Sequence, residues 1–165
     1  MKQFFLFIVF FTSFAAFAKA QTEEQKLASD TTRFWNLFNA YGKDTAVYTK
    51  SNYAFKPHVL VKRELKNDIL ILEWGSFSGT VLAEMKCYKG KVHNLTGYNY
   101  WGAGYKTIKE QLMKKGFALL GEKQDIILQS PDGNCLVQLV TTTSSILPTF
   151  ISISNRETSE LFQKL

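Results

Sequence analysis

The sequence has few cysteines and few histidines, and this scarcity narrows the chemistry that it can support. Its 165 residues include two Cys and two His. A zinc site needs three or four convergent nitrogen or sulfur ligands. His58 and His93 lie far apart in the sequence, and the cysteines form no short pair. We therefore predict structural or surface imidazoles, no metal site and no cofactor.

Long hydrophobic runs are missing everywhere except at the N-terminus. Met1 to Gln3 gives a short positive start, residues 4–18 are almost wholly apolar, and Ala18 and Ala20 place small residues around a cleavage point. This pattern is typical of an export signal, and the run is short for a helix that must cross a bilayer. We predict a signal peptide over residues 1–20, a mature chain that starts at Gln21, and a secreted or periplasmic protein with no stable membrane insertion after cleavage.

The mature chain also lacks a large excess of one charge. Removing Lys2 and Lys19 with the signal lowers the 20 basic residues to 18, against 14 acidic ones, and the net charge from +6 to +4. A charge of this size gives no basic stripe for phosphate contacts. We predict that the protein does not bind nucleic acid. A hydrophobic content of 45 % instead predicts a folded domain.

Hydrophobic periodicity predicts an α+β domain. Residues 21–41 carry apolar side chains at helical spacing, from Leu27 to Tyr41. The period then changes to two, and four strands follow over 55–65, 68–74, 80–88 and 91–98. In the first of these strands Phe55, Val59, Val61 and Leu65 should share the buried face.

The second half repeats this order of elements. A helix is predicted over residues 105–115, with Thr107 and Glu110 at capping-box spacing, and four strands over 117–121, 125–129, 134–142 and 149–154. The mostly antiparallel sheet would consist of two meanders, with both helices packed on one face. We predict one domain over residues 21–165, with an internal duplication, halves about 21–100 and 101–165, as the alternative.

Export makes the state of Cys87 and Cys135 an open question. A disulfide between them would close a long loop and stabilise the fold. Each cysteine also lies at an apolar position of a predicted strand, where a free thiol packs as a small hydrophobic side chain. Both states remain possible from the sequence alone.

Catalytic motifs are scarce. The loop over residues 75–79 resembles a nucleophile elbow only in its glycines, because its central residue is Phe77, and another strand follows. Glu73 and Glu84 lie on neighbouring predicted strands and could form the pair of carboxylates that glycoside hydrolysis requires. We keep a small exported hydrolase as the alternative function.

The most unusual stretch is 98–105, Tyr-Asn-Tyr-Trp-Gly-Ala-Gly-Tyr, between a predicted strand and a helix. Tyr98, Tyr100, Trp101 and Tyr105 could bind a protein or a glycan, because Tyr and Trp carry much of the energy of interfaces. They could equally fill the core at the start of the helix. The leading hypothesis is an exported, non-catalytic binding protein, similar to an inhibitor or immunity module. A structural, envelope-associated protein is a further alternative.

Overall fold

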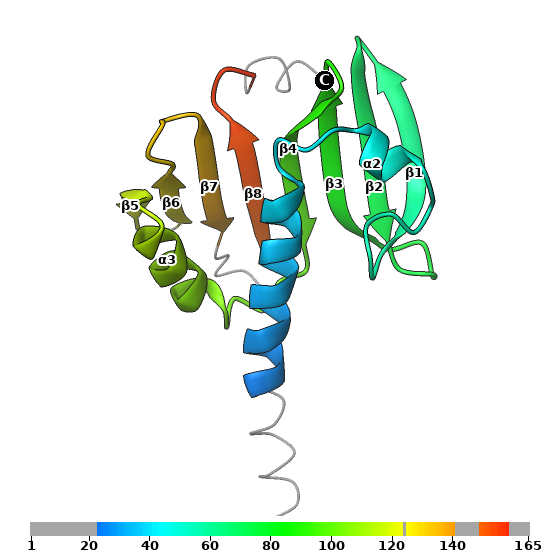
Figure 1. Cartoon of the computed structure of the whole chain (residues 1–165). Coiled ribbons are helices and arrows are strands. Elements are labelled where there is room, and N and C mark those ends of the chain that lie inside the picture. The colour runs from blue at the N-terminus through cyan, green and yellow to red at the C-terminus, as the bar shows by residue number, and fades with distance from the viewer. Residues whose placement is uncertain (1–22, 124, 141–148, 159–165) are drawn as a thin grey trace, which may run out of the picture.

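The protein is an α+β domain in which one open, eight-stranded antiparallel sheet carries helices on one face (Figure 1). The computed structural model describes residues 23–123, 125–140 and 149–158. The predicted fold class is confirmed, whereas the predicted signal peptide lies outside the described residues. Within the described ranges, no helix is long and apolar enough to cross a membrane.

Each half of the chain supplies a helix followed by four strands, and the first half adds one short helix between them. The first half contains a helix over residues 23–40, α2 (Ala46–Thr49), β1 (Val59–Lys66), β2 (Ile69–Gly75), β3 (Val81–Tyr88) and β4 (Lys91–Tyr98). The second half contains α3 (Tyr105–Lys114), β5 (Ala118–Glu122), β6 (Asp125–Gln129), β7 (Cys135–Val140) and β8 (Phe150–Asn155). The shared order of elements fits the duplication alternative, which stays a prediction because the order alone does not establish common ancestry.

The two halves join at the centre of the sheet. Its strand order is β1-β2-β3-β4-β8-β7-β6-β5, so the last strand of each half pairs with the other. In the β4–β8 register Leu95 lies opposite Ile153 and Gly97 lies opposite Ile151. These two isoleucines and Leu95 are fully buried. The junction is therefore also the middle of the hydrophobic core.

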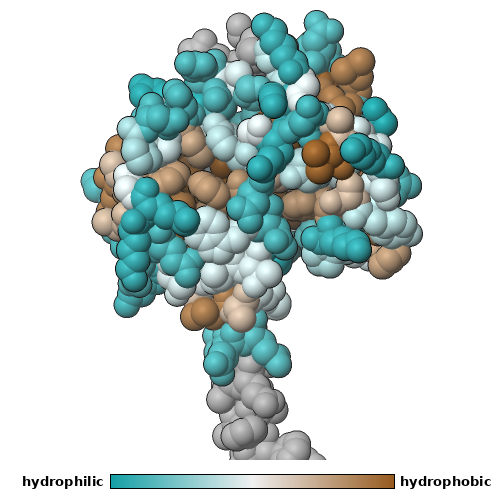
Figure 2. All heavy atoms as spheres, viewed as in Figure 1, coloured by the Kyte–Doolittle hydropathy of each residue, from teal (hydrophilic) through white to brown (hydrophobic). Residues whose placement is uncertain are grey.

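The core lies between the sheet and its helices. Phe34 and Leu37 of the helix over residues 23–40 and Ile108 and Leu112 of α3 belong to the same buried cluster as the inward residues of the strands. The first turns of the long helix extend beyond the sheet (Figures 1 and 2), and Leu27 is 39 % exposed there. The predicted helix is thus correct, but its buried stripe begins later than expected.

The predicted buried face of the first strand is wrong. The strand begins at Val59, and its register shifts between Leu60 and Lys62, so that Leu60 lies opposite Trp74 and packs on the core. Leu65 is 71 % exposed because β1 is an edge strand. Phe55 is buried, but it lies in the turn before the strand.

The predicted capping box is also absent. Helix α3 begins at Tyr105 after Gly104, and no side chain caps its first turn. Gly104 stands so close to Asp30 that an added Cβ would lie 2.7 Å from the Asp30 Cβ. Close packing against the long helix, and not a local side-chain cap, therefore sets the start of α3.

Removing a buried side chain at the junction should weaken the whole domain. Ile153→Ala removes side-chain atoms at the centre of the core, and we expect it to lower the free energy of unfolding by about 2 to 5 kcal/mol. Urea denaturation followed by circular dichroism measures this change. Leu65→Ala is the control, and its exposed position should change stability by less than about 0.5 kcal/mol. Equal effects of the two variants would contradict the assigned core.

Candidate functional site

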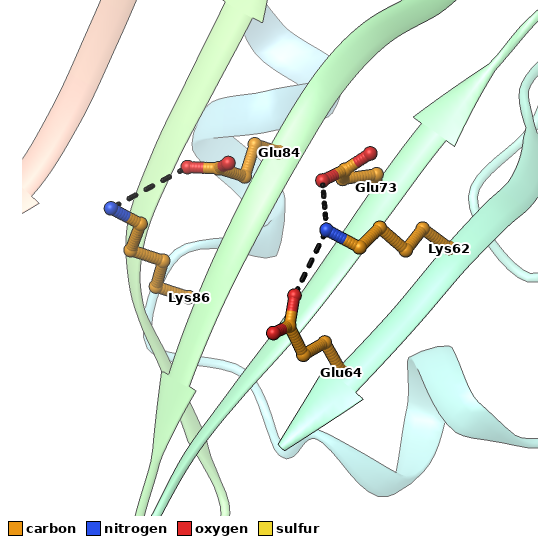
Figure 3. Close-up of polar contacts among 5 residues, drawn as sticks. All are labelled: Lys62, Glu64, Glu73, Glu84 and Lys86. Atoms are coloured by element: carbon orange, nitrogen blue, oxygen red, sulfur yellow. Dashed lines mark hydrogen bonds and ion pairs between the residues drawn. The ribbon is translucent and has the colours of Figure 1, made fainter. Parts of the chain in front are cut away.

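The face of the sheet opposite the helices carries a group of charges of both signs. Figure 3 shows Lys62 and Glu64 from β1, Glu73 from β2, and Glu84 and Lys86 from β3. In the strand register Lys62 lies opposite Glu73, and Glu73 lies opposite Glu84. Their neighbours Leu72, Trp74, Ala83 and Met85 point into the core. We call these five charged residues the charged ladder, and the surface that bears them the open face.

Each glutamate of the ladder has a lysine partner. Lys62 Nζ lies 2.9 Å from Glu64 Oε2 and 3.3 Å from Glu73 Oε1, and Lys86 Nζ lies 3.6 Å from Glu84 Oε1. Hydrogen bonds with Glu64 and Glu73 raise the pKa of Lys62, and the bond to Lys62 lowers the pKa of Glu64. Lys62 and Glu64 are 51 % and 42 % exposed, and an ion pair at such exposed positions contributes little to stability. The ladder therefore determines what the face can recognise more than how firmly it folds.

A shallow hollow lies at the end of the ladder. It measures about 350 Å³ and is lined by Glu73, Val81, Glu84, Tyr98 and Asn99. Tyr98 must face this side, because an added Cβ on the preceding Gly97 would clash with Leu37 and Tyr100 on the helix side. The hollow brings the first residue of the aromatic stretch together with both candidate carboxylates. This association is not apparent from the sequence, because it depends on the strand register.

The hydroxyl of Tyr98 stays protonated in this hollow. Burial raises its pKa, and the negative charges of Glu84 and Glu73 raise it further. The phenol therefore offers one hydrogen-bond donor beside two carboxylate acceptors. A ligand with donor groups or a positive charge matches the carboxylates of this arrangement.

The other aromatic residues of the stretch lie elsewhere. Tyr100 and Tyr105 are 5 % and 2 % exposed, and the Tyr105 hydroxyl donates a hydrogen bond to the Phe150 carbonyl over 3.1 Å. Trp101 is 62 % exposed, with Lys26 Nζ 4.8 Å from its ring centroid. The four predicted binding residues therefore form no single surface. Tyr98 faces the open side, Trp101 lies against the long helix, and two tyrosines fill the core.

A buried carboxylate and an arginine hold this stretch in place. Asp30 is fully buried, and its two oxygens accept hydrogen bonds from the backbone N–H groups of Trp101 and Gly104 over 3.0 and 3.3 Å. Arg33 donates to the carbonyls of Tyr98 and Asn99. Its guanidinium carbon also lies 4.4 Å from the centroid of the Tyr100 ring. The long helix thus fixes the backbone on both sides of Tyr100.

Sequence reasoning missed Asp30 and Arg33. The available signal was a carboxylate four residues before Phe34, on the apolar stripe of the helix, where a charge is costly unless it is paired. Arg33 gave no signal, because a basic residue beside an apolar stripe is ordinary on a helix surface.

The two cysteines are free and buried. Cys87 lies on β3 and Cys135 on β7, with β4 and β8 between them. Three strand spacings amount to about 14 Å, whereas bridged cysteines have Cα atoms less than about 7 Å apart. The disulfide alternative is therefore wrong. Burial raises the pKa of both thiols, that of Cys135 to about 11, so neither is an activated nucleophile.

The histidines also occupy structural positions. The His58 ring lies 5.6 Å from the Phe55 ring, and burial lowers the pKa values of His58 and His93. Among the described residues, no three His, Cys, Asp or Glu side chains are grouped so that they could hold a metal ion.

Comparison of the chain with protein-family models, with curated proteins and with solved structures gives no match. The assignment of a function therefore depends on the chemistry of the surfaces described above.

Removing the Asp30 carboxylate should destabilise the protein. Asp30→Ala leaves two backbone N–H groups without acceptors, and we expect a loss of about 2 to 4 kcal/mol in the free energy of unfolding. Asp30→Asn keeps one acceptor oxygen and should lose less. Glu24→Ala, an exposed change on the same helix, is the control. Urea unfolding measures all three variants, and an Asp30→Ala protein as stable as the control would contradict the assigned role.

Alkaline pH should weaken the fold. Burial raises the pKa of Cys135 from 9.0 to about 11 and that of Tyr41 from 10.0 to about 12. A raised pKa means that the fold favours the protonated group, so this stabilisation is complete below pH 9 and declines as the pH rises toward 12. Denaturant unfolding at pH 8 and pH 11 measures the decline.

The cysteines should also be protected from thiol reagents at pH 8. We expect both to react with a maleimide only after unfolding. Rapid labelling of the native protein would contradict the burial of the two thiols. The absence of both free thiols after unfolding would contradict their unbonded state.

Proposed function

We propose that this chain is an exported, non-catalytic protein that binds a protein partner through the open face of its sheet. The observation that carries the proposal is the hollow beside Tyr98, where Glu73 and Glu84 lie directly opposite each other on neighbouring strands. Like charges in this position destabilise a sheet. Sites that break a local rule of stability are often functional.

The partner should present a lysine or an arginine to the hollow. A cationic side chain placed between Glu73 and Glu84 would relieve their mutual repulsion, and a guanidinium can bond two carboxylate oxygens at once. The alternating charges of Lys62, Glu64 and Lys86 would form the polar rim that surrounds the central contacts of many interfaces. A mixed rim of this kind is complementary to a protein surface, which also carries both signs of charge.

The predicted export of the chain supports a protein-binding function. A secreted or periplasmic chain of this size meets other exported proteins and has no access to cytoplasmic nucleic acid. The predicted signal over residues 1–20 is the basis for this location. Inhibitors and immunity proteins belong to the same broad class of small, non-catalytic binding proteins.

The hydrolase alternative keeps one favourable observation. Residues directly opposite each other on antiparallel strands have Cβ atoms about 5 Å apart, so the Glu73 and Glu84 carboxyls can approach the separation used in glycoside hydrolysis. One of the two would have to hold a proton as the general acid. Glu73 lies 3.3 Å from Lys62 and Glu84 lies 3.6 Å from Lys86, so each carboxyl group is already engaged in an ion pair within the sheet. Binding is the better supported function.

Reversing one charge in the hollow should weaken binding strongly. The mature chain, residues 21–165, is immobilised and exposed to the exported proteins of the producing cells, and retained proteins are quantified by mass spectrometry. Glu84→Lys should reduce retention of the specific partner about tenfold or more, because it places a positive charge against the partner's cation. Trp101→Ala, on the other side of the sheet, should retain the partner normally.

The matched control is Glu110→Lys, which makes the same charge change at an exposed position on α3. If Glu84→Lys and Glu110→Lys reduce retention equally, or neither does, the open face is not the binding surface. Hydrolysis of a panel of glycosides that is lost in Glu84→Gln would instead favour the alternative. A retained glycan in place of a protein would assign the same face to a different class of ligand.

A further inference from the structure

The two edges of the sheet differ in their protection against pairing with another strand. The β1 edge carries Lys62, Arg63, Glu64 and Lys66, and charged side chains are a common means of keeping an edge strand from pairing. The β5 edge, Ala118–Glu122, carries a single charged side chain, Glu122. Only the β5 edge therefore presents backbone groups beside mainly apolar side chains.

Exposed apolar side chains gather at the β5 edge. Leu119 and Leu120 are 37 % and 57 % exposed, and Met113, in the last turn of α3 just before the strand, is 46 % exposed. In Figure 2 hydrophobic side chains lie at the left margin of the molecule, where Figure 1 places β5. An isolated exposed leucine is ordinary, but adjacent ones on an unpaired edge favour association.

A second observation marks the same place. A hollow of about 610 Å³ follows the β5–β6 hairpin and is lined by Leu120, Gly121, Glu122, Lys123, Asp125 and Ile127. The apolar lining comes from Leu120 on β5 and Ile127 on β6, and the polar lining lies toward the turn of the hairpin. An added strand beside β5 would therefore find both free backbone groups and a recess for a side chain.

We propose that a second copy of this chain pairs with β5, strand to antiparallel strand, about a two-fold axis. The two copies would join their sheets into one continuous antiparallel sheet. A two-fold axis that relates identical strands makes them antiparallel and brings the same surface of each copy together, so a single apolar edge is sufficient for both.

The charges at the two ends of β5 favour this occupant. Lys114 and Lys115 precede the strand, and Glu122, Lys123 and Asp125 lie at its far end. The far end is close to neutral, because Glu122 pairs with Lys109 of α3 and Lys123 accompanies Asp125. Antiparallel pairing keeps the two lysines of each copy away from those of its partner and beside the partner's Glu122 and Asp125, whereas parallel pairing would place the lysine pairs together.

This surface is separate from the open-face ladder. The ladder lies on β1, β2 and β3, at the opposite edge from β5 in the strand order. Pairing through β5 therefore leaves the hollow at Tyr98 accessible, and the proposal does not depend on the proposed function. In a dimer the two hollows would be presented by one assembly, which increases the avidity for a partner with repeated sites.

Sedimentation velocity of the mature chain tests the proposal. Because the interface is small, the measurement extends to roughly 0.5 mM protein. We expect a concentration-dependent monomer–dimer equilibrium, and Leu120→Lys should raise the dimer dissociation constant about tenfold or more by placing a charge on the edge. Met113→Lys, an exposed change on α3, should also weaken the dimer. It serves as a second test variant if Leu120→Lys does not fold.

Leu65→Lys is the matched control, because it places the same charge on the exposed leucine of the other edge strand. It should leave the dissociation constant unchanged. A wild-type chain that stays monomeric over the whole concentration range overturns the proposal, even if a different protein binds β5. The proposal is also overturned if Leu65→Lys weakens the dimer as much as Leu120→Lys does. It is likewise overturned if neither Leu120→Lys nor Met113→Lys weakens the dimer.

Discussion

The pairing of β4 with β8 is the constraint on which the rest of this structure depends. Each strand ends a four-stranded meander, and a meander with one apolar face must cover that face to be stable. Pairing Leu95 with Ile153 and Gly97 with Ile151 merges the two units into one sheet. The helices of both halves then cover the same face, and the opposite face carries the charged ladder beside a small separate apolar cluster of Ile69, Ile71 and Tyr88. The proposed binding surface is thus a direct consequence of the way in which the halves join.

The long helix connects this junction to the candidate site. Asp30 accepts hydrogen bonds from the backbone N–H groups at positions 101 and 104, and Arg33 donates to the carbonyls at positions 98 and 99. Because these bonds fix the chain on both sides of Tyr100, they hold Tyr98 at the edge of the hollow. Placing the site on a strand, with its following loop tied to a helix, gives the preorganised surface that specific binding requires.

Much of the fold was predictable from the sequence, because period and turn residues are local signals. The bounds of β4 and β6 agree with the prediction, and α3 buries Tyr105, Ile108 and Leu112 as its spacing indicates. One wrong assignment concerns β1, where a register shift and an edge position override the alternating pattern. The run of charged residues in β1 fits its edge position, but the register shift leaves no mark in the residues of the strand.

The site was less predictable than the fold, because it combines distant residues. The sequence suggested Glu73 with Glu84 and, separately, the aromatic stretch. The hollow that joins Tyr98 to both glutamates depends on the strand register. Asp30 showed the same limitation, because the bonding partners of a buried carboxylate lie about seventy residues away. The state of the cysteines also required the strand order, since β4 and β8 separate them.

The proposed function requires that the open face binds a protein. Residue-specific photo-crosslinking tests this binding, with a photoreactive amino acid placed at Tyr98 on the open face or at the exposed Lys106 on α3. The protein is produced and exported by its own cells, illuminated and analysed for covalent adducts. If the open face binds a protein, a discrete protein adduct forms from position 98 and none from position 106. An adduct from position 106 alone, or from neither position, would show that the open face is not the binding surface.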